Sequence, residues 1–370
     1  MTTIFVSAGE PSGDLHAAHV VSALRRIAPG IRVEGVGGAH LAAAGVDLLA
    51  RIEGLTVMGF VEVVRKIPAH LRLLRAIRKR LARGDVQLVL LVDYPGFHRR
   101  VAAAAHALGV PVLYYIAPQA WAWREGRVRW LRQLTARVAV ILPFEEAFFR
   151  AHGVPATFVG HPLLDQIPAV ADRRAAKIAL GLDPARPALG VFPGSRPQEV
   201  RRMWDAFRAT AERVLDRRPE VQVVVAATPA GRYPAAGPLK LVYGQPEVCL
   251  AASDAALCKS GTTTLQAALS DTPLVIAYSV HRLSYEIGRR LAQVRWLGLV
   301  NLVAGREIAP EFVQDRMRPD LMADALLPLL AEGGAERTRQ LEDLAMVRGL
   351  LGEPGAAQRV ARMAQEIIAS

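Results

Sequence analysis

The sequence VFPGSRPQE at residues 191–199 carries the clearest signature of the fold. The apolar run Ala188–Phe192 is typical of a buried strand, and Gly194 allows a tight turn after it. We predict that Ser195 opens a helix with Glu199 in its first turn, where an acidic side chain suits the helix dipole. The stretch is therefore predicted to be the strand–turn–helix junction of a parallel α/β sheet.

A junction of this kind suits an anionic ligand. Backbone N–H groups at the turn point at whatever lies above the sheet, and they favour a phosphate. Arg196 adds a planar cationic fork that matches a phosphate or pyrophosphate. A second junction follows the run 255–258, where Ser260 and three threonines supply hydroxyl and backbone donors. Two such helix starts in one domain favour a diphosphate site, although an ordinary βα turn stays open for the first motif alone.

Strand-like apolar runs alternate with helical patterns along most of the chain. The runs cover residues 3–7, 32–36, 87–92, 112–115, 138–142, 188–192, 222–226, 240–243, 255–258 and 274–277. Helical stretches separate most of them, which predicts parallel, doubly wound sheets. A proline-marked break at about 160–187 divides the pattern. We predict an α/β fold of two Rossmann-like domains, 1–165 and 166–349, whose sheets face a central cleft. The helices of about 350–370 are candidates to pack back on the first domain.

Composition limits the class of protein. No basic n-region precedes the first apolar run, and no run approaches the ~20 residues of a spanning helix, so we expect a soluble or peripheral protein. Cys249 and Cys258 have neither metal nor disulfide spacing, which suits a reducing cytoplasm. The net charge of +12 predicts an anionic partner and leaves nucleic acid, a membrane face and phosphorylated substrates open. Neither an Asp-x-Asp pair nor a histidine cluster offers a metal site, and we expect no cofactor.

Two loops of the first domain carry candidate catalytic side chains. The first strand runs into AGEPSGDLH at residues 8–16, which has neither the glycine spacing of a dinucleotide fingerprint nor the Lys of a P-loop. This loop offers the carboxylates of Glu10 and Asp14, although Asp14 also suits a helix cap. Asp93 directly follows a buried strand, a position that suits a general base, with a helix cap as the alternative.

Two further segments of the first domain have two readings each. The aromatic loop 115–124 suits either a sugar or acyl site or the core. A basic helix is predicted up to Arg83. Its apolar residues at helical spacing are Ile67, Leu71, Leu74, Ile77 and Leu81. This helix suits either an anionic membrane surface or the outer layer of the fold, with its apolar stripe on the sheet.

In their order along the chain, these motifs resemble the lipid-A-disaccharide synthase family. The matching segments are 8–14, 58–63, 93–97, 118–124, 143–145, 159–165, 193–199, 260–265, 301–302 and 310–314. The resemblance implies a metal-independent GT-B glycosyltransferase, with an acceptor bound by the first domain and a UDP-sugar by the second. It implies condensation of UDP-2,3-diacylglucosamine with 2,3-diacylglucosamine 1-phosphate (lipid X) to the lipid A disaccharide 1-phosphate and UDP. It also implies a protein peripheral to the cytoplasmic face of the inner membrane.

The resemblance implies roles for individual residues. Asp93 matches the essential Asp of the family, which we expect to deprotonate the acceptor 6-hydroxyl for inverting attack on the anomeric carbon. Glu10 and Asp14 are expected to face the acceptor or shape the cleft. The residues expected at the UDP-sugar are Gly194, Ser195, Arg196, Ser260, Gly261, Thr262, Thr263, Gln266, Asn301, Glu311 and Gln314. Both substrates carry acyl chains, so a membrane contact is also expected. Its candidates are Val63, Val64, Ile67 and Leu71.

Two positions depart from the family pattern. Gln266 stands where the family usually has Glu, whose carboxylate would accept hydrogen bonds from the ribose hydroxyls. Gln keeps one acceptor oxygen but loses the charge, so the affinity for the nucleotide is left open. His98 stands in place of the usual Asn, and its role near Asp93 is left open too.

Two other functions stay open on the residues alone. Another GT-B sugar-nucleotide enzyme, such as a UDP-N-acetylglucosamine 2-epimerase, shares the architecture but needs no membrane-facing basic helix. A basic nucleic-acid-binding protein would account for the charge, but its aromatics should interleave with Arg on one face. Here they gather between Trp121 and Trp130. We therefore expect no nucleic-acid partner, and monomer and homodimer are both left open.

Overall fold

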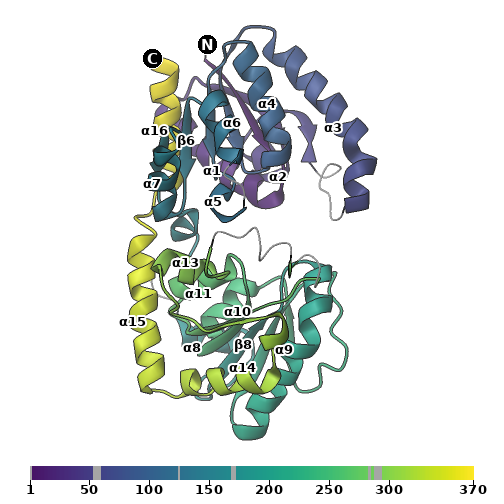
Figure 1. Ribbon diagram of the computed structural model, residues 1–370, viewed down its shortest axis with the longest axis vertical. Helices are drawn as coiled ribbons and strands as arrows, with labels where there is room; N and C mark the ends of the chain where they lie inside the picture. Colours follow the sequence, from purple (N-terminus) through teal and green to yellow (C-terminus); the bar gives the residue numbers. More distant parts are fainter. Residues whose placement is uncertain (1, 53–59, 124–125, 168–171, 282–284, 287–293) are drawn as a thin grey trace. The chain divides into compact units, whose positions relative to one another are not determined.

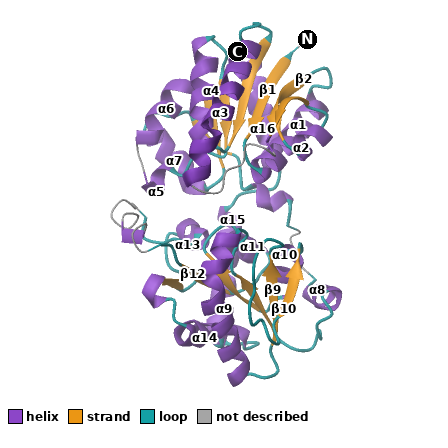
Figure 2. Ribbon diagram, turned by 90° about the vertical axis from the view of Figure 1, so that its right-hand side faces the viewer, coloured by secondary structure: helices purple, strands orange, loops and turns teal. Residues whose placement is uncertain are grey.

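The computed structural model describes residues 2–52, 60–123, 126–167, 172–281, 285–286 and 294–370, without the side chains of 60–66, 123 and 127. The chain divides into two compact units (Figure 1). Unit 1 comprises Met1–Pro162 and Gly352–Ser370, and unit 2 comprises Leu163–Leu351. Each unit is built on one parallel β-sheet with helices against it (Figure 2).

Within the described residues, unit 1 forms a seven-stranded sheet in the order β3-β2-β1-β4-β5-β6-β7. Its strands are β1 Thr3–Ala8, β2 Arg32–Gly37, β3 Asp47–Arg51, β4 Val86–Val92, β5 Val112–Tyr115, β6 Arg137–Val140 and β7 Ala156–Phe158. Its helices are α1 Pro11–Ile27, α2 Ala39–Ala43, α3 Phe60–Leu81, α4 Pro95–Ala107, α5 Ala120–Trp123, α6 Gly126–Leu134, α7 Pro143–Ala151 and α16 Ala356–Ala369. All of β1 and nearly all of β4 are buried, so these central strands read as continuous apolar runs.

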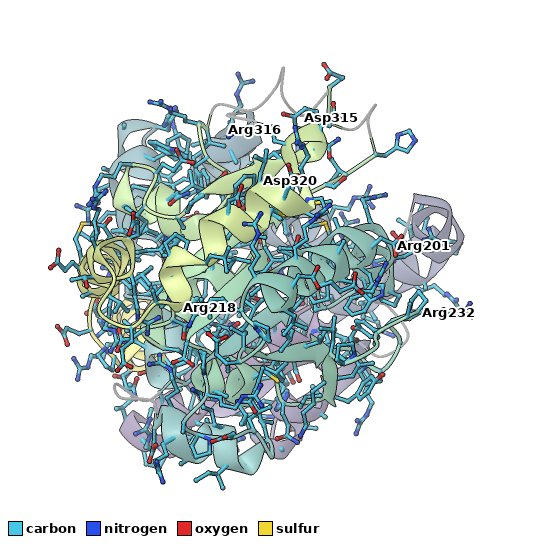
Figure 3. All side chains as sticks on the ribbon, turned by 90° about the horizontal axis from the view of Figure 1, so that it is seen from below. Arg201, Arg218, Arg232, Asp315, Arg316 and Asp320 are labelled. Carbon is cyan, nitrogen blue, oxygen red and sulfur yellow. The ribbon has the colours of Figure 1, made fainter. Side chains whose placement is uncertain are left out.

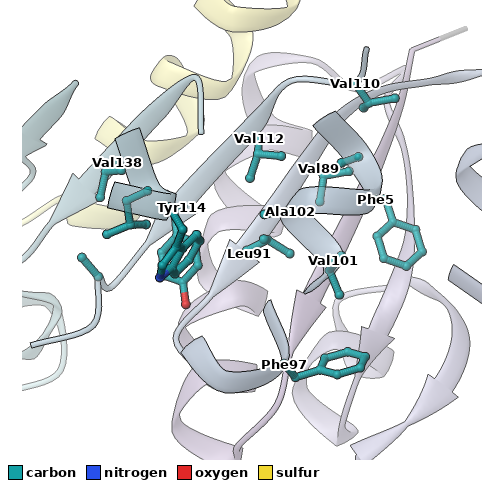
Figure 4. Packing of buried hydrophobic residues seen from close by; sticks show 14 of the residues in the cluster. Phe5, Val89, Leu91, Phe97, Val101, Ala102, Val110, Val112, Tyr114 and Val138 are labelled. Atoms are coloured by element: carbon teal, nitrogen blue, oxygen red, sulfur yellow. The ribbon is translucent and has the colours of Figure 1, made fainter. Parts of the chain in front are cut away.

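Helices cover both faces of the unit 1 sheet. On one face, Val101 and Ala102 of α4 share an apolar cluster with Val89 and Leu91 of β4 (Figure 4). On the other face, α1 and α16 pack against each other and share a second cluster with β1 and β4. Full burial of a Val or Leu side chain contributes about 1.5–3 kcal/mol, so these two layers hold the central strands in place.

In its described part, unit 2 forms a six-stranded parallel sheet in the order β10-β9-β8-β11-β12-β13. Its strands are β8 Ala188–Phe192, β9 Gln222–Ala227, β10 Lys240–Tyr243, β11 Ala255–Lys259, β12 Leu274–Tyr278 and β13 Glu311–Val313. Its helices are α8 Arg173–Ala179, α9 Pro197–Arg217, α10 Pro246–Ala252, α11 Thr263–Leu269, α13 Leu299–Ala304, α14 Pro319–Leu326 and α15 Ala335–Leu350. Trp204 and Phe207 of α9 and Met322 of α14 belong to one buried cluster on this sheet.

The predicted fold class is confirmed, and a strand lies at each of the predicted apolar runs. Three strands were not predicted, namely β3, β7 and β13. Each is an edge strand that is only partly buried, so it lacks the long apolar run that marks a central strand.

The helix after β8 begins later than predicted. Arg196 is the N-cap of α9 and Pro197 is its first residue, so Ser195 lies in the turn and not in the helix. Proline suits a first helical position because its missing N–H would have no partner inside the helix there. The side chain of Glu199 reaches back to this turn.

Candidate active site

The carboxyl ends of β1 and β4 bring two of the predicted carboxylates together in unit 1. Ala8 pairs with Val92 at the ends of these neighbouring strands, so the loops that follow leave the sheet side by side. Asp93 is half-buried, and burial raises the pKa of its carboxyl. The nearby charge of Glu10 raises it further. A carboxylate with a raised pKa accepts a proton more readily, which makes Asp93 the candidate general base.

Tyr94 lies against the glycine-rich loop that follows β1. A Cβ on Gly9 would lie 2.2 Å from the Tyr94 ring, so the ring packs on the loop only because position 9 is glycine. The Tyr94 hydroxyl lies 2.8 Å from His70 Nε2, which ties α3 to the segment after β4. Packing against Tyr94 therefore explains one glycine of a loop that matched no nucleotide-binding fingerprint.

Asp14 is buried on α1 and turns toward the loop between β2 and α2. Its carboxylate accepts hydrogen bonds from the backbone N–H groups of Gly38 at 2.6 Å and His40 at 2.8 Å. These donors belong to the start of α2, which lacks a capping side chain of its own. In the structure Asp14 holds this loop, and its role in facing the acceptor or shaping the cleft stays a prediction.

Most described side chains of the aromatic loop 115–124 are buried, although that of Gln119 is exposed. Trp121 is buried, and its Nε1 donates to Glu145 Oε1 at 2.9 Å. The other Glu145 oxygen accepts from the backbone N–H groups of Ile141 and Leu142 and so caps the start of α7. Burial raises the pKa of Glu145 to about 7, against the lowering effect of these donors. The side chain of Trp123 lies outside the described residues.

Three histidines of unit 1 are held neutral by burial. Burial lowers the pKa of His98 to about 4. It also lowers the pKa of His16 to about 4 and that of His161 to about 3, with smaller contributions from His19 and His16 respectively. Unfolding restores the ordinary value of 6.5, so below that pH the unfolded chain binds more protons than the folded one. Glu145 and Asp93 act in the opposite sense, because the folded pKa of each is the higher one.

We expect unit 1 to lose stability as the pH falls from about 6.5 to 4.5. Each titrating group changes the free energy of unfolding by about 1.4 kcal/mol per pH unit inside its window. Three histidines lower this free energy, and Glu145 and Asp93 raise it, so the net loss is roughly 1–3 kcal/mol per pH unit. The midpoint of urea unfolding at several pH values measures it. His98→Asn should reduce the slope by about 1.4 kcal/mol per pH unit, and a midpoint independent of pH would contradict the prediction.

Unit 2 contains a cavity of about 540 Å³ at the carboxyl ends of β8, β9 and β11. Its volume falls in the range of small-molecule sites. The predicted nucleotide-site residues that line it are Gly194, Ser195, Arg196, Gly261, Thr262, Thr263 and Gln266. Lys259 also lines it, although we did not predict this residue as a ligand. Its place at the end of β11, directly before the second predicted junction, is the signal that would have found it.

The backbone N–H groups predicted to meet an anion are bound by Glu199. Its Oε2 accepts from Ser195 N at 3.1 Å and from Arg196 N at 3.3 Å. Lys259 Nζ lies 3.1 Å from the other carboxylate oxygen. Burial opposes ionisation of Glu199, but Lys259 and the two N–H groups outweigh it and hold its pKa below the ordinary value. The prediction that these backbone N–H groups are unpaired is therefore wrong. The cavity is lined by Lys259 and Arg196, next to a turn whose N–H groups are bound by Glu199.

Four predicted nucleotide contacts do not line this cavity and instead hold loops. Ser260 Oγ donates to Leu297 O at 2.7 Å. Asn301 is fully buried and binds the main chain of 308–309 through both ends of its amide. Glu311 accepts from the N–H groups of 297–298, and Gln314 exchanges two hydrogen bonds with Val280. All four side chains therefore position main chain, and their contact with the nucleotide stays a prediction.

The apolar residues of the basic helix α3 divide between the core and the surface. Leu73, Leu74, Ile77 and Leu81 lie in the core against the sheet, whereas Ile67 and Leu71 are 43% and 38% exposed. Val63 and Val64 lie outside the residues whose side chains are described. The exposed cations beside this apolar pair are Arg72, Arg75, Arg78 and Lys79. None of the helices in the described part of the chain has the length and apolar character needed to cross a membrane.

Sequence comparisons agree on one family. A family model described as Lipid-A-disaccharide synthetase matches residues 4–366. The lipid-A-disaccharide synthase of Myxococcus xanthus (strain DK1622) is 42% identical over 374 residues, which cover 99% of this chain and 97% of that protein. The lipid-A-disaccharide synthase of Syntrophus aciditrophicus (strain SB) is 40% identical over 381 residues, with 99% and 97% covered.

Solved structures are similar to this chain in fold. The calicheamicin glycosyltransferase CalG4 matches with a TM-score of 0.60 at 18% identity, covering 100% of this chain and 97% of CalG4. A UDP-GlcNAc 2-epimerase from Neisseria meningitidis matches with a TM-score of 0.63 at 11% identity, covering 100% of each chain. At these identities the likeness shows the fold alone, which is the GT-B fold predicted from the motifs. The family model and the relatives that match over nearly the whole length show that the chain belongs to the lipid-A-disaccharide synthase family, a family of glycosyltransferases.

Proposed function

We propose that the chain condenses UDP-2,3-diacylglucosamine with 2,3-diacylglucosamine 1-phosphate to the lipid A disaccharide 1-phosphate and UDP. The observation that carries this proposal is the half-buried Asp93 carboxylate beside Glu10, in a chain of the lipid-A-disaccharide synthase family. Unit 1 is proposed to bind the acceptor at the carboxyl ends of β1 and β4. Unit 2 is proposed to bind the UDP-sugar in the cavity lined by Arg196 and Lys259.

In this reaction, Asp93 removes the proton from the 6-hydroxyl of the acceptor while that oxygen attacks the anomeric carbon. The bond from the anomeric carbon to the diphosphate oxygen breaks, its electron pair leaves with UDP, and the configuration inverts. Burial and the charge of Glu10 both raise the pKa of Asp93, which strengthens it as the base. Glu10 is thus proposed to act through its effect on Asp93.

The leaving diphosphate requires positive charge and hydrogen-bond donors. Arg196 and Lys259 line the unit 2 cavity and are proposed to supply the charge. Gly261, Thr262 and Thr263 line the same cavity, and their N–H and hydroxyl groups suit phosphate oxygens. The amide oxygen of Gln266 is proposed to accept a hydrogen bond from the ribose.

The test is incubation of the purified protein with both acylated substrates, followed by mass spectrometry of the products. The proposal requires one disaccharide 1-phosphate for each UDP released. UDP-N-acetylglucosamine without an acylated acceptor serves as the control substrate and should be recovered unchanged. Epimerisation of this control substrate, together with a lack of disaccharide, would contradict the proposal and favour the sugar-nucleotide epimerase.

The proposal includes contact of α3 with the cytoplasmic face of the inner membrane. Both substrates carry acyl chains, so the enzyme has to reach them at the bilayer. Ile67 and Leu71 are exposed and suit the acyl boundary, while the exposed cations of α3 suit anionic headgroups.

Replacing both Ile67 and Leu71 with Ser should weaken binding to anionic liposomes about tenfold, because partial burial of two such side chains contributes roughly 1–2 kcal/mol. Cosedimentation with vesicles that contain an anionic phospholipid measures this change. Leu108→Ser is the matched control. Leu108 is an apolar residue of the same unit that is 46% exposed, and it lies at the C-terminal end of α4 and not on α3. Equal sedimentation of the double variant and the control would remove α3 from the membrane contact.

A further inference from the structure

The main chain at Asp93 is held on both sides. Its carbonyl oxygen lies 2.6 Å from His98 Nδ1 and accepts a hydrogen bond from the Tyr114 hydroxyl at 2.5 Å. Its N–H donates to Tyr115 O at 3.0 Å. Because peptide groups are planar, these contacts orient both peptides that flank the Asp93 Cα. They therefore set the direction in which the carboxylate leaves the chain.

The partners of His98 determine where its proton lies. His98 is fully buried, and a carbonyl oxygen only accepts, so Nδ1 carries the proton that points at Asp93 O. In the neutral ring Nε2 is then an acceptor, and Ser7 Oγ donates to it at 2.9 Å. Burial, which lowers the pKa of His98 to about 4, keeps this neutral form at neutral pH.

The backbone conformation explains why such support is needed. Asp93 and Tyr94 both have φ of 53°, in the left-handed region that residues with a side chain rarely adopt. Such conformations persist where the surroundings over-determine them, and they cluster at functional sites. His98 on α4, Ser7 on β1 and Tyr114 on β5 enclose the end of β4 from three elements; Tyr114 appears in the core view of Figure 4.

We propose that His98 is a positioning residue of the glycosyl transfer. Its Nδ1–H bond to the Asp93 carbonyl holds the Asp93 carboxylate in the orientation in which it receives the acceptor proton. Tyr114 supplies the second hydrogen bond to the same oxygen. This inference rests on the proposed function, in which Asp93 is the base. His98 acts only through the main chain of Asp93, whose carboxylate is also influenced by Glu10 and Tyr94.

Two amide variants separate the two ring nitrogens of His98. In His98→Asn the amide nitrogen takes the place of Nδ1 and retains a donor for the Asp93 carbonyl. In His98→Gln the amide lies one bond further out, near Ser7, and leaves that carbonyl with Tyr114 alone. We expect Asn to retain kcat within about threefold and Gln to lower it roughly 10- to 100-fold, because misplacing a catalytic group by 1 Å costs about 10²-fold. KM for both substrates should stay unchanged in both variants.

The pH profile is a readout that a purely structural role would not move. The acid limb of kcat/KM reports the pKa of the base. In His98→Gln this limb should shift to lower pH, because the carboxylate is no longer held in its buried place beside Glu10. In His98→Asn it should stay at the wild-type position. The affinity for UDP, measured by calorimetry, reports on unit 2 and should be the same for all variants.

Equal kcat and equal acid limbs in the Asn and Gln variants would overturn the positioning role. Wild-type kcat in Asp93→Asn would overturn both this role and the assignment of the base, so the two failures are distinguishable. If His98→Gln does not fold, Tyr114→Phe tests the same carbonyl by removing its second donor. Unchanged kcat and an unchanged acid limb in Tyr114→Phe would then also overturn the proposal.

Discussion

Asp93→Asn is expected to lower kcat for disaccharide formation by about 10²–10⁴-fold, the usual contribution of a positioned general base. The amide retains the shape of the side chain but accepts no proton from the acceptor hydroxyl. The main-chain hydrogen bonds of Asp93 to Tyr115 and His98 do not involve the carboxylate, so the fold around β4 should persist. The rate of disaccharide formation under saturating substrates measures the effect.

The controls separate loss of the base from loss of the fold. Asp47→Asn changes an exposed carboxylate on the edge strand β3 of the same unit and should leave kcat at the wild-type value. The affinity of Asp93→Asn for UDP should also be that of the wild type, because the unit 2 cavity contains no part of unit 1 among its described lining residues. Equal turnover by Asp93→Asn and the wild type would leave the reaction standing and dismiss Asp93 as its base.

Arg196→Ala is expected to lower kcat/KM by about 10²–10³-fold, as the loss of one preorganised donor to a developing anion does in other enzymes. Arg196 is the N-cap of α9 and lines the unit 2 cavity, where the proposed reaction releases a diphosphate. The charge on the leaving oxygen increases during bond breaking, so kcat should fall together with the affinity for UDP. Steady-state kinetics and calorimetric titration with UDP measure the two effects.

Arg196→Lys and Arg201→Ala are the matched variants for this prediction. Lys retains the charge but not the planar fork, so it should recover only part of the lost activity. Arg201 is an exposed arginine near the start of the same helix and is not among the described residues that line the cavity (Figure 3). Its replacement should leave kcat/KM unchanged. Equal losses in Arg196→Ala and Arg201→Ala would point to the overall charge of unit 2 and not to a diphosphate contact.

Some of the cations counted in the net charge bind groups inside the fold, so the net charge alone is weak evidence for an anionic partner. Arg25 donates to the carbonyls of Ala44 and Gly45, and Arg359 donates to the carbonyl of Val159. Arg80, which belongs to the basic run of α3, is buried and pairs with Glu34 and Asp85. These cations join segments of the fold, so only the exposed ones, such as those of α3, remain available to an anionic surface.

The pattern of apolar residues was sufficient to predict the two parallel sheets and the carboxyl-end positions of Asp93 and Gly194. Central strands of a parallel sheet are buried on both faces, so each one needs a continuous apolar run that is visible in the chain. The edge strands β3 and β13 are less buried, so they have no continuous apolar run and were not predicted. The motif order added the family, which the comparisons confirm.

The hydrogen-bond partners of the polar side chains are visible only in the three-dimensional structure. Asp14 is a candidate site residue from its loop, and Asn301 and Gln314 are candidates from the family resemblance, yet all three hold main-chain groups of other segments. In the same way, Glu199 fills the turn that was predicted to receive a phosphate, and His98 holds the carbonyl of Asp93. Burial follows from residue type and spacing, which are local properties. The partner of a buried polar group depends on which distant backbone groups the finished fold leaves without a hydrogen bond, and no local pattern contains that information.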